Sequence, residues 1–195
     1  MSHYFIEDEN LLSEQKKIDY YFGSEKFEFI TDNGVFSKDH IDPASELLLL
    51  NIPNISGDYL DLGCGYGCIG IILAKINQIK LTQSDVNGLA LDLTSKNCEI
   101  NNVNSTIIKS DCFDDIKGSF DTISLNPPIH AGKSVTYKMY EQSFEHLNIN
   151  GKIYVVTLKK HGANSTMTKL IEIFGNCEIL YKKKGYLVFC ATKNK

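Results

Sequence analysis

Beyond residue 57, short apolar segments alternate with longer segments in which apolar residues recur at every third or fourth position. Residues 69–76 and 167–174 show the spacing i, i+3, i+4, i+7 most clearly, which predicts two helices. Further helices are expected at 87–100 and 134–147. The short segments predict strands at 59–62, 79–84, 106–109, 120–125, 152–158, 177–182 and 186–191.

This alternation indicates an α/β fold. Repeated β-α units form a mostly parallel sheet through right-handed crossovers, with helices on both faces. We therefore predict a doubly wound, Rossmann-like sheet, which the last two strands, around Gly185, complete with an antiparallel C-terminal strand. In such sheets ligands bind beyond the carboxyl ends of the strands, so the functional residues are expected there.

The first 56 residues do not follow the alternation. We interpret them as an N-terminal elaboration of a single domain, residues 1–195, whose core spans residues 57–195. Asn33-Gly34 lies between two apolar segments, a pattern that is typical of a β-hairpin turn. Asp42 followed by Pro43 predicts a helix start, with Asp as the N-cap and Pro as the first helical residue. The elaboration is thus expected to hold one hairpin and one helix.

Composition narrows the class of protein. With 195 residues, of which 43% are hydrophobic, the chain resembles an ordinary globular domain. Its apolar stretches are far shorter than the roughly 20 residues that cross a bilayer. The first ten residues are polar and acidic, unlike a signal peptide, so a cytoplasmic location without membrane contact is expected. The six cysteines form no C-x-x-C pair, which argues against a disulfide framework or a metal site.

Charge is distributed unevenly along the chain, which contains no arginine. Residues 1–151 carry 11 lysines against 22 acidic residues, whereas residues 152–195 carry 9 lysines against 2 acidic residues. Lys159, Lys160 and residues 182–184 are candidates for a surface that follows a phosphate backbone. The alternative is that these lysines only coat a solvated surface.

An unusual polar group follows each of the first four predicted strands of the core. Asp61 and a glycine-rich turn end the first strand, and glycines allow sharp turns and a close approach to a ligand. Asp85 ends the second, about where a carboxylate can accept hydrogen bonds from two ribose hydroxyls. Asp111-Cys112 follows the third, and Asn126-Pro127-Pro128 follows the fourth. We therefore expect one site built from four strand ends.

Gly65, Gly67 and Gly70 also form a literal G-x-G-x-x-G, the fingerprint of dinucleotide-binding dehydrogenases. Asp61, two residues before the turn, suits a cationic ligand better than a pyrophosphate. A dehydrogenase would also give no role to Asp111 or to the Asn-Pro-Pro segment. The dehydrogenase hypothesis therefore explains fewer of these residues than a single site that uses all four strand ends.

Together, DLGCGYG at residues 61–67, Asp85, Asp111 and NPPI at 126–129 resemble the class I S-adenosylmethionine-dependent methyltransferases. A closer likeness covers nearly the whole chain and points to a small-domain family that includes the small-subunit ribosomal RNA guanine-N2 methyltransferases. It is carried by residues 31–38, 61–70, 84–87, 126–133 and 183–186. Known ribosomal RNA members have a second, degenerate methyltransferase-like domain, whereas this sequence shows one copy.

The resemblance implies a cofactor, a partner and site residues. The cofactor is S-adenosylmethionine, and the partner is RNA, expected to be ribosomal RNA or a ribosomal subunit. No metal is implied, and a homodimer is left open. Asp61 is expected to contact the amino group of the cofactor or the surrounding backbone. The implied residues are Asp61, Gly63, Cys64, Gly65, Asp85, Asp111, Cys112 and Phe36 for the cofactor, Asn126 and Pro127 for catalysis, and Pro128, Ile129 and His130 for the substrate.

The expected reaction is methylation of the exocyclic N2 amine of a guanine. Such an amine is a poor nucleophile, so the Asn126 side-chain oxygen and the Pro127 carbonyl are expected to orient it and stabilise its developing charge. The base must be single-stranded or flipped out to reach them. Other acceptors stay open: adenine N6, protein glutamine N5 or a small molecule. Adenine and glutamine relatives have an aromatic residue where Ile129 stands, which favours guanine. A non-catalytic RNA-binding module is the remaining alternative.

Overall fold

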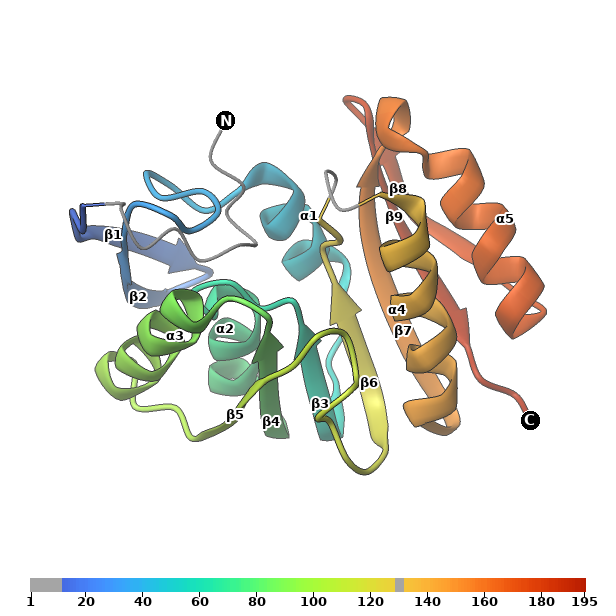
Figure 1. Ribbon diagram of the computed structural model, residues 1–195, viewed down its shortest axis with the longest axis horizontal. Coiled ribbons are helices and arrows are strands. Elements are labelled where there is room, and N and C mark those ends of the chain that lie inside the picture. Colours follow the sequence, from blue (N-terminus) through green and yellow to red (C-terminus); the bar gives the residue numbers. More distant parts are fainter. Residues whose placement is uncertain (1–11, 129–131) are drawn as a thin grey trace.

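A seven-stranded sheet forms the centre of the protein (Figure 1). The computed structural model describes residues 12–128 and 132–195. The strand order is β5-β4-β3-β6-β7-β9-β8, and the first five of these strands run parallel, while β9 is antiparallel to both β7 and β8. The doubly wound sheet with an antiparallel C-terminal strand is thereby confirmed. The strands are β3 (Ser56–Leu62), β4 (Gln78–Asp85), β5 (Ser105–Lys109), β6 (Phe120–Leu125), β7 (Leu147–Leu158), β8 (Glu178–Lys183) and β9 (Tyr186–Thr192).

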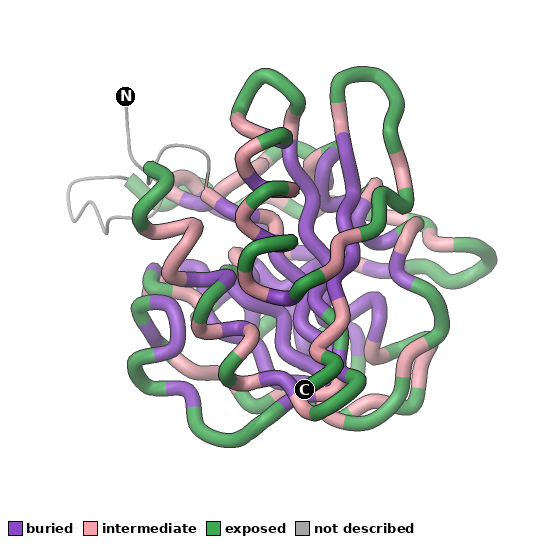
Figure 2. The backbone as a smooth tube through the Cα atoms, turned by 90° about the vertical axis from the view of Figure 1, so that its right-hand side faces the viewer, coloured by how far each residue is buried: buried purple, intermediate pink, exposed green. Residues whose placement is uncertain are grey.

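Helices cover both faces of the sheet. Figure 1 shows α1, α2 and α3 to the left of the sheet and α4 and α5 to its right. The central strands between them are largely buried, whereas β8 at one edge of the sheet is mostly exposed, and further exposed residues lie on the outer sides of the helices and on the loops (Figure 2). No helix in the described ranges is long and apolar enough to cross a membrane. The helices are α1 (Pro43–Asn51), α2 (Cys68–Ile76), α3 (Gly88–Ile100), α4 (Lys133–His146) and α5 (Ala163–Phe174), with a short 3₁₀ turn, η1 (Lys159–His161).

The N-terminal hairpin exists, but the predicted position of its turn is wrong. Strand β1 (Lys16–Phe22) pairs with β2 (Glu25–Thr31) through a tight turn at residues 23–24. Asn33-Gly34 does form a turn, yet no strand follows it. The Gly34 carbonyl oxygen instead accepts a hydrogen bond from Asn87 Nδ2 at 3.3 Å, which ties the loop after β2 to the start of α3. This loop therefore runs towards the carboxyl ends of the sheet.

Asn97 of α3 and Asn101, the C-cap of that helix, dock the hairpin onto the core. The Asn97 amide accepts from Ile30 N at 2.6 Å and donates to Ile30 O at 2.9 Å. Asn101 makes the same pair of bonds with the backbone of Glu28, at 3.1 and 2.8 Å. Asn97 also donates to the Tyr66 carbonyl, at 2.9 Å. One helix thus connects β2 with the turn that follows β3.

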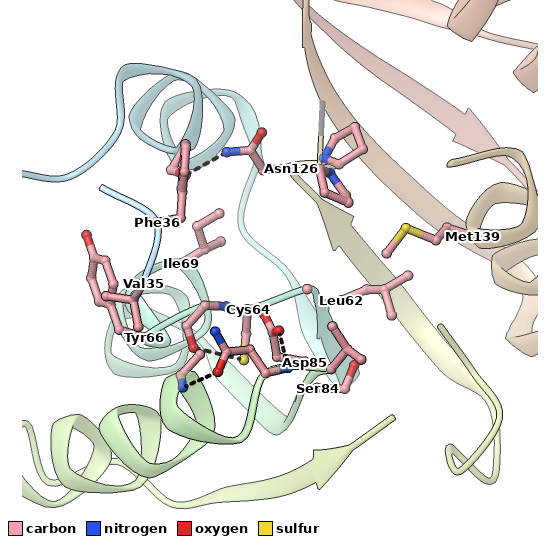
Figure 3. Close-up of a pocket in the computed structure, with 18 of the residues that line it drawn as sticks. Val35, Phe36, Leu62, Cys64, Tyr66, Ile69, Ser84, Asp85, Asn126 and Met139 are labelled. Carbon is pink, nitrogen blue, oxygen red and sulfur yellow. Dashed lines mark hydrogen bonds between the residues drawn. The ribbon is translucent and has the colours of Figure 1, made fainter. Parts of the chain in front are cut away.

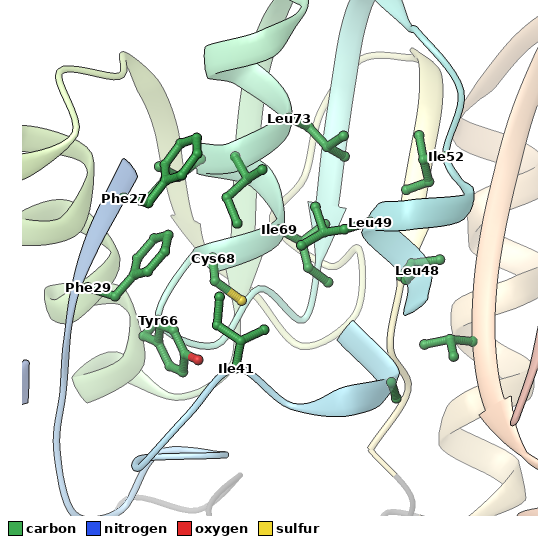
Figure 4. Close-up of a cluster of buried hydrophobic side chains, with 14 of the residues drawn as sticks. Phe27, Phe29, Ile41, Leu48, Leu49, Ile52, Tyr66, Cys68, Ile69 and Leu73 are labelled. Atoms are coloured by element: carbon green, nitrogen blue, oxygen red, sulfur yellow. The ribbon is translucent and has the colours of Figure 1, made fainter. Parts of the chain in front are cut away.

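Aromatic packing beneath the hairpin completes this side of the core (Figure 4). Phe27 and Phe29 are fully buried, with ring centroids 6.3 Å apart, and Phe29 lies 6.0 Å from the Tyr66 ring. Because each buried aromatic ring contributes a few kcal/mol, the hairpin is an integral part of the hydrophobic core.

The helix start at Asp42 is confirmed. The Asp42 carboxylate accepts from Ser45 N at 3.0 Å, and Pro43 occupies the first helical position. Strand β7 begins at Leu147, earlier than the predicted residue 152, and pairs with Phe120 across a bulge. Asn150 adopts a left-handed φ of 67° in this bulged stretch.

Candidate active site

A cavity of about 300 Å³ opens at the carboxyl ends of β3, β4, β5 and β6. The loop after β2 and the start of α1 close it on another side. Figure 3 shows Phe36 and Tyr66 on one side and Leu62 and Met139 on the opposite side, with Asn126 across the cavity from Asp85. All four predicted strand ends therefore contribute to one site.

The turn after β3 is glycine-rich because its backbone is left-handed. Gly63, Gly65 and Gly67 have φ values of 69°, 57° and 90°, which other residues adopt only with strain. A side chain at Gly65 would meet no atom within 4 Å, so the cavity approaches the backbone there. At Gly70 a side chain would lie 2.7 Å from Gln83, so this glycine allows α2 to pack on β4.

Hydrogen bonds already engage the backbone N–H groups of this turn. Gly65 N donates to Asp85 Oδ2 at 2.8 Å, Gly67 N to the Cys64 carbonyl at 2.9 Å, and Gly70 N to Asp61 Oδ2 at 2.9 Å. In a dinucleotide site, such amides approach the pyrophosphate. The three glycines of the G-x-G-x-x-G therefore do not offer a phosphate cradle here.

The charge of the cavity supports the same conclusion. Asp42, Asp85 and Asp111 line it, and no lysine is present among its described lining residues. Carboxylates that line a cavity repel a pyrophosphate and attract a positively charged ligand. The site thus fits a cationic ligand.

Asp85 lies at the end of β4, where both of its oxygens accept backbone hydrogen bonds. Oδ2 accepts from Gly65 N and Oδ1 from Asn87 N, at 2.8 and 2.9 Å. Burial raises the pKa of this carboxyl, while these bonds favour its charged form. A carboxylate has about four lone pairs, so each oxygen can still accept from a ligand hydroxyl.

Asp111 and Cys112 follow β5. Asp111 is exposed at the rim of the cavity, and Cys112 is buried with a left-handed φ of 54°. Ser110 Oγ donates to the Cys112 carbonyl at 3.0 Å, which fixes this turn. Burial raises the pKa of the Cys112 thiol to about 12 and that of Cys64 well above its usual value. Both thiols are therefore neutral at physiological pH and unsuited to nucleophilic attack.

Asp61 lies beneath the glycine turn rather than in the lining of the cavity. Its Oδ2 accepts from Gly70 N, and its Oδ1 accepts from Ser124 Oγ at 3.1 Å. Ser124 Oγ in turn lies 2.5 Å from Tyr59 Oη. Burial raises the pKa of the Asp61 carboxyl to about 6. Its contacts therefore hold the surrounding backbone, which is one of the two roles expected for it.

We expect Asp61→Asn to stabilise the protein above pH 6. A carboxyl whose pKa is raised on folding destabilises the folded state as pH rises from about 4 through about 6, by up to about 3 kcal/mol. Asparagine keeps an acceptor for Gly70 N and is neutral. Urea unfolding between pH 4.5 and 8 measures the free energy of unfolding of both proteins. The excess stability of Asp61→Asn over the wild type should grow up to about pH 6 and then stay constant. Asp58→Asn, half-exposed on the same strand, is the control, and a pH-independent difference would contradict the prediction.

Asn126, Pro127 and Pro128 follow β6 and line the cavity. Asn126 Nδ2 donates to Asp42 Oδ2 at 3.1 Å and to Ser45 Oγ at 3.0 Å. The substrate residues predicted at Ile129 and His130 lie outside the described residues. Among those that are described, no group of three His, Cys, Asp or Glu residues could hold a metal ion.

The structure adds cavity residues that sequence reasoning missed. Asp42 and Ser45 reach Asn126 from α1, across more than 80 residues of sequence. Met139 enters from α4, and Ser84 lines the cavity from β4. The buried Ser84 hydroxyl has no hydrogen-bond partner within the described ranges. Two of these carried a sequence signal: Asp42 as a helix cap, and Ser84 as part of residues 84–87, which carry the family resemblance.

Comparison with known proteins identifies the family. A family model described as the methyltransferase small domain matches residues 26–190. The chain belongs to this family. The match begins within the hairpin, so the N-terminal elaboration is largely part of the family's shared domain.

The chain is also similar to proteins that are named as ribosomal RNA methyltransferases. The ribosomal RNA small subunit methyltransferase C of Hamiltonella defensa is 38% identical over 167 residues, which are 82% of this chain and 48% of that protein. YbxB of Bacillus subtilis, an uncharacterized protein, is 38% identical over 197 residues and 98% of both chains.

A solved structure extends the likeness to three dimensions. The 16S rRNA guanosine-N2 methyltransferase RsmC of T. thermophilus, in complex with AdoMet and guanosine, superimposes with a TM-score of 0.82 and 25% identity. The superposition covers 92% of this chain and 50% of the RsmC chain. The chain thus spans about half the length of these ribosomal RNA enzymes and nearly all of YbxB.

Proposed function

We propose that the protein is an S-adenosylmethionine-dependent methyltransferase that methylates the exocyclic N2 amine of a guanine in small-subunit ribosomal RNA. The observation that carries the proposal is the acidic cavity, whose glycine turn has its amides engaged and whose rim presents Asn126-Pro127-Pro128. The names of the relatives support the choice of acceptor.

The residues present fit the cofactor. When bound, S-adenosylmethionine supplies a methyl group on a positively charged sulfur. Asp85 would accept from the two ribose hydroxyls, and Asp111 would accept from the adenine amino group, with Cys112 beside it. The open backbone at Gly63 and Gly65 would lie against the methionine part. The carboxylates favour the cation over a neutral competitor.

Asn126 and Pro127 would act on the acceptor amine. Their oxygens accept its two hydrogens, which directs the nitrogen lone pair at the methyl group. The amine would gain positive charge as it takes up the methyl group that the cofactor supplies, and the same two oxygens would stabilise that charge. The surplus proton then leaves to water. Two consecutive prolines restrict the backbone of this turn and keep the Pro127 carbonyl in place.

A basic surface next to the cavity suits an RNA partner. We define it as the five exposed residues Lys159, Lys160, Lys182, Lys183 and Lys184. Strand β7 ends at Leu158 on the carboxyl edge of the sheet, and the Lys159 amide donates to the Gly185 carbonyl at 2.7 Å, which joins η1 to the β8–β9 turn. Within the described part of the chain, none of the five pairs with a carboxylate. Phosphates would meet uncompensated charge beside the site.

Methyl transfer tests the function directly. Ribosomal subunits and naked ribosomal RNA from cells that lack this protein would be incubated with labelled S-adenosylmethionine, digested to nucleosides and analysed by mass. N2-methylguanosine is the expected product. If the label instead appeared in adenosine, in protein glutamine or in a small molecule, the methyl acceptor would be that group and not guanine N2. RNA binding without any transfer would favour a non-catalytic module and overturn the proposal.

We expect the triple variant Lys182→Gln, Lys183→Gln and Lys184→Gln to weaken RNA binding and its salt dependence. Each lost phosphate contact should reduce the slope of log K against log salt by roughly 0.7 to 0.9. Filter binding between 50 and 300 mM salt measures this slope. The control neutralises Lys80, Lys117 and Lys152, which lie towards the opposite edge of the sheet. Equal slopes for the two variants would show that the basic surface does not contact RNA.

A further inference from the structure

The N-terminus of α1 forms a small hydrogen-bond network with Asn126. The Asp42 Oδ2 atom accepts three bonds: from Ser45 N at 3.0 Å, from Ser45 Oγ at 3.5 Å and from Asn126 Nδ2 at 3.1 Å. Asn126 Nδ2 also donates to Ser45 Oγ at 3.0 Å. Both hydrogens of the Asn126 amide therefore point at α1.

The chemistry of Asp42 gives these bonds a direction. An ionised carboxylate only accepts hydrogen bonds, so the group that faces it must donate. Ser45 Oγ turns its proton to Asp42 and offers a lone pair to Asn126. An asparagine amide could otherwise flip, since its oxygen and nitrogen have nearly the same shape. Here the flipped amide would place its oxygen against the carboxylate, which is repulsive.

We propose that Asp42 and Ser45 are positioning residues that hold the Asn126 amide in the one orientation in which its oxygen is presented to the acceptor amine. The inference rests on the proposed function of Asn126. In the flipped orientation, the amide would present hydrogens to an amine that must itself donate, and the lone pair would no longer be directed at the methyl group.

Helix α1 is a firm support for this arrangement. Ser45 is 6% exposed, and Leu48 and Leu49 on the next turn are fully buried in the core. The helix packs between α2 and the strands β7 and β9. Rigid elements hold a site more precisely than loops do. The position of the Asn126 oxygen is therefore fixed by α1, which belongs to the N-terminal elaboration.

Kinetics of a double-mutant cycle provide the first test. Ser45→Ala should lower kcat roughly fivefold, because one neutral hydrogen bond is lost, while the KM for S-adenosylmethionine stays unchanged. Adding Asp42→Asn, which keeps the helix cap, should bring the loss to roughly tenfold or more. In an Asn126→Ala background the same changes should have no further effect. Glu46→Ala, on the first turn but away from Asn126, is the matched control.

Nuclear magnetic resonance of the Asn126 side chain provides a second test that needs no activity. Its amide signals are identified by their loss in Asn126→Ala. The Asp42→Asn/Ser45→Ala variant should exchange these hydrogens with water at least tenfold faster than the wild type. Unchanged exchange, or equal losses of kcat in both backgrounds, would overturn the inference. If the wild type transfers no methyl group, the proposed function fails, and the exchange rates still decide the orientation.

Discussion

Asn126→Ala is expected to lower kcat by roughly 100- to 1,000-fold, the usual cost of removing one preorganised group that stabilises transition-state charge. The alanine variant has no side-chain oxygen to accept a hydrogen of the amine, so the lone pair is no longer directed and the developing charge loses a partner. Single-turnover transfer to ribosomal RNA at saturating cofactor measures the chemical step.

Two controls separate catalysis from stability in this experiment. Asn148→Ala removes an asparagine that likewise donates to an aspartate, Asp121, at 2.8 Å, but lies at the start of β7 and outside the cavity. It should leave kcat unchanged. The affinity of Asn126→Ala for S-adenosylmethionine should also stay within about twofold of the wild type. A normal kcat in Asn126→Ala would remove this residue from the mechanism.

Asp85→Ala is expected to weaken binding of S-adenosylmethionine by at least about 100-fold. Hydrogen bonds to a charged acceptor are each worth about 1.5–3 kcal/mol, and the carboxylate is placed to accept two from the ribose. It also fixes Gly65 N and Asn87 N, so the turn loses an anchor as well. Calorimetric titration with S-adenosylmethionine gives the Kd directly.

The pattern of the kinetic constants distinguishes a binding role for Asp85 from a chemical one. Ribose contacts act equally in the ground and transition states, so KM for the cofactor should rise while kcat at saturation changes little. Asp92→Ala, an exposed aspartate on α3, is the matched control. Wild-type affinity in Asp85→Ala would contradict a ribose contact.

The sheet was predictable because its signals are local. Alternating strands and helices define the β-α order, and a polar segment follows each of the first four predicted strands of the core, whose ends the structure brings to one cavity. The Asp42-Pro43 helix start depends only on neighbouring residues, so its prediction is confirmed. The roles of the individual cavity residues stay predictions.

Other features depend on contacts that are distant in sequence. Asn33-Gly34 has the composition of a hairpin turn, but the partner strand of β2 lies upstream, where Ile18, Tyr20 and Phe22 alternate with polar residues. The loop after Gly34 is directed instead by Asn87, more than 50 residues away. Likewise, no local pattern shows that the N-cap of α1 also binds Asn126.

Asn97 of α3 and Asn101, the C-cap of that helix, also cover the second edge of β2. A β-strand with one unpaired edge is a template for pairing with another chain. In the hairpin, β1 covers one edge of β2, and the amides of Asn97 and Asn101 satisfy the backbone of Ile30 and Glu28 along the other edge. Asn97 also donates to the Tyr66 carbonyl. Detachment of the hairpin would therefore expose the unpaired backbone of β2 and loosen the glycine turn in the same event. Aggregation and loss of cofactor binding should therefore begin from one partially unfolded state.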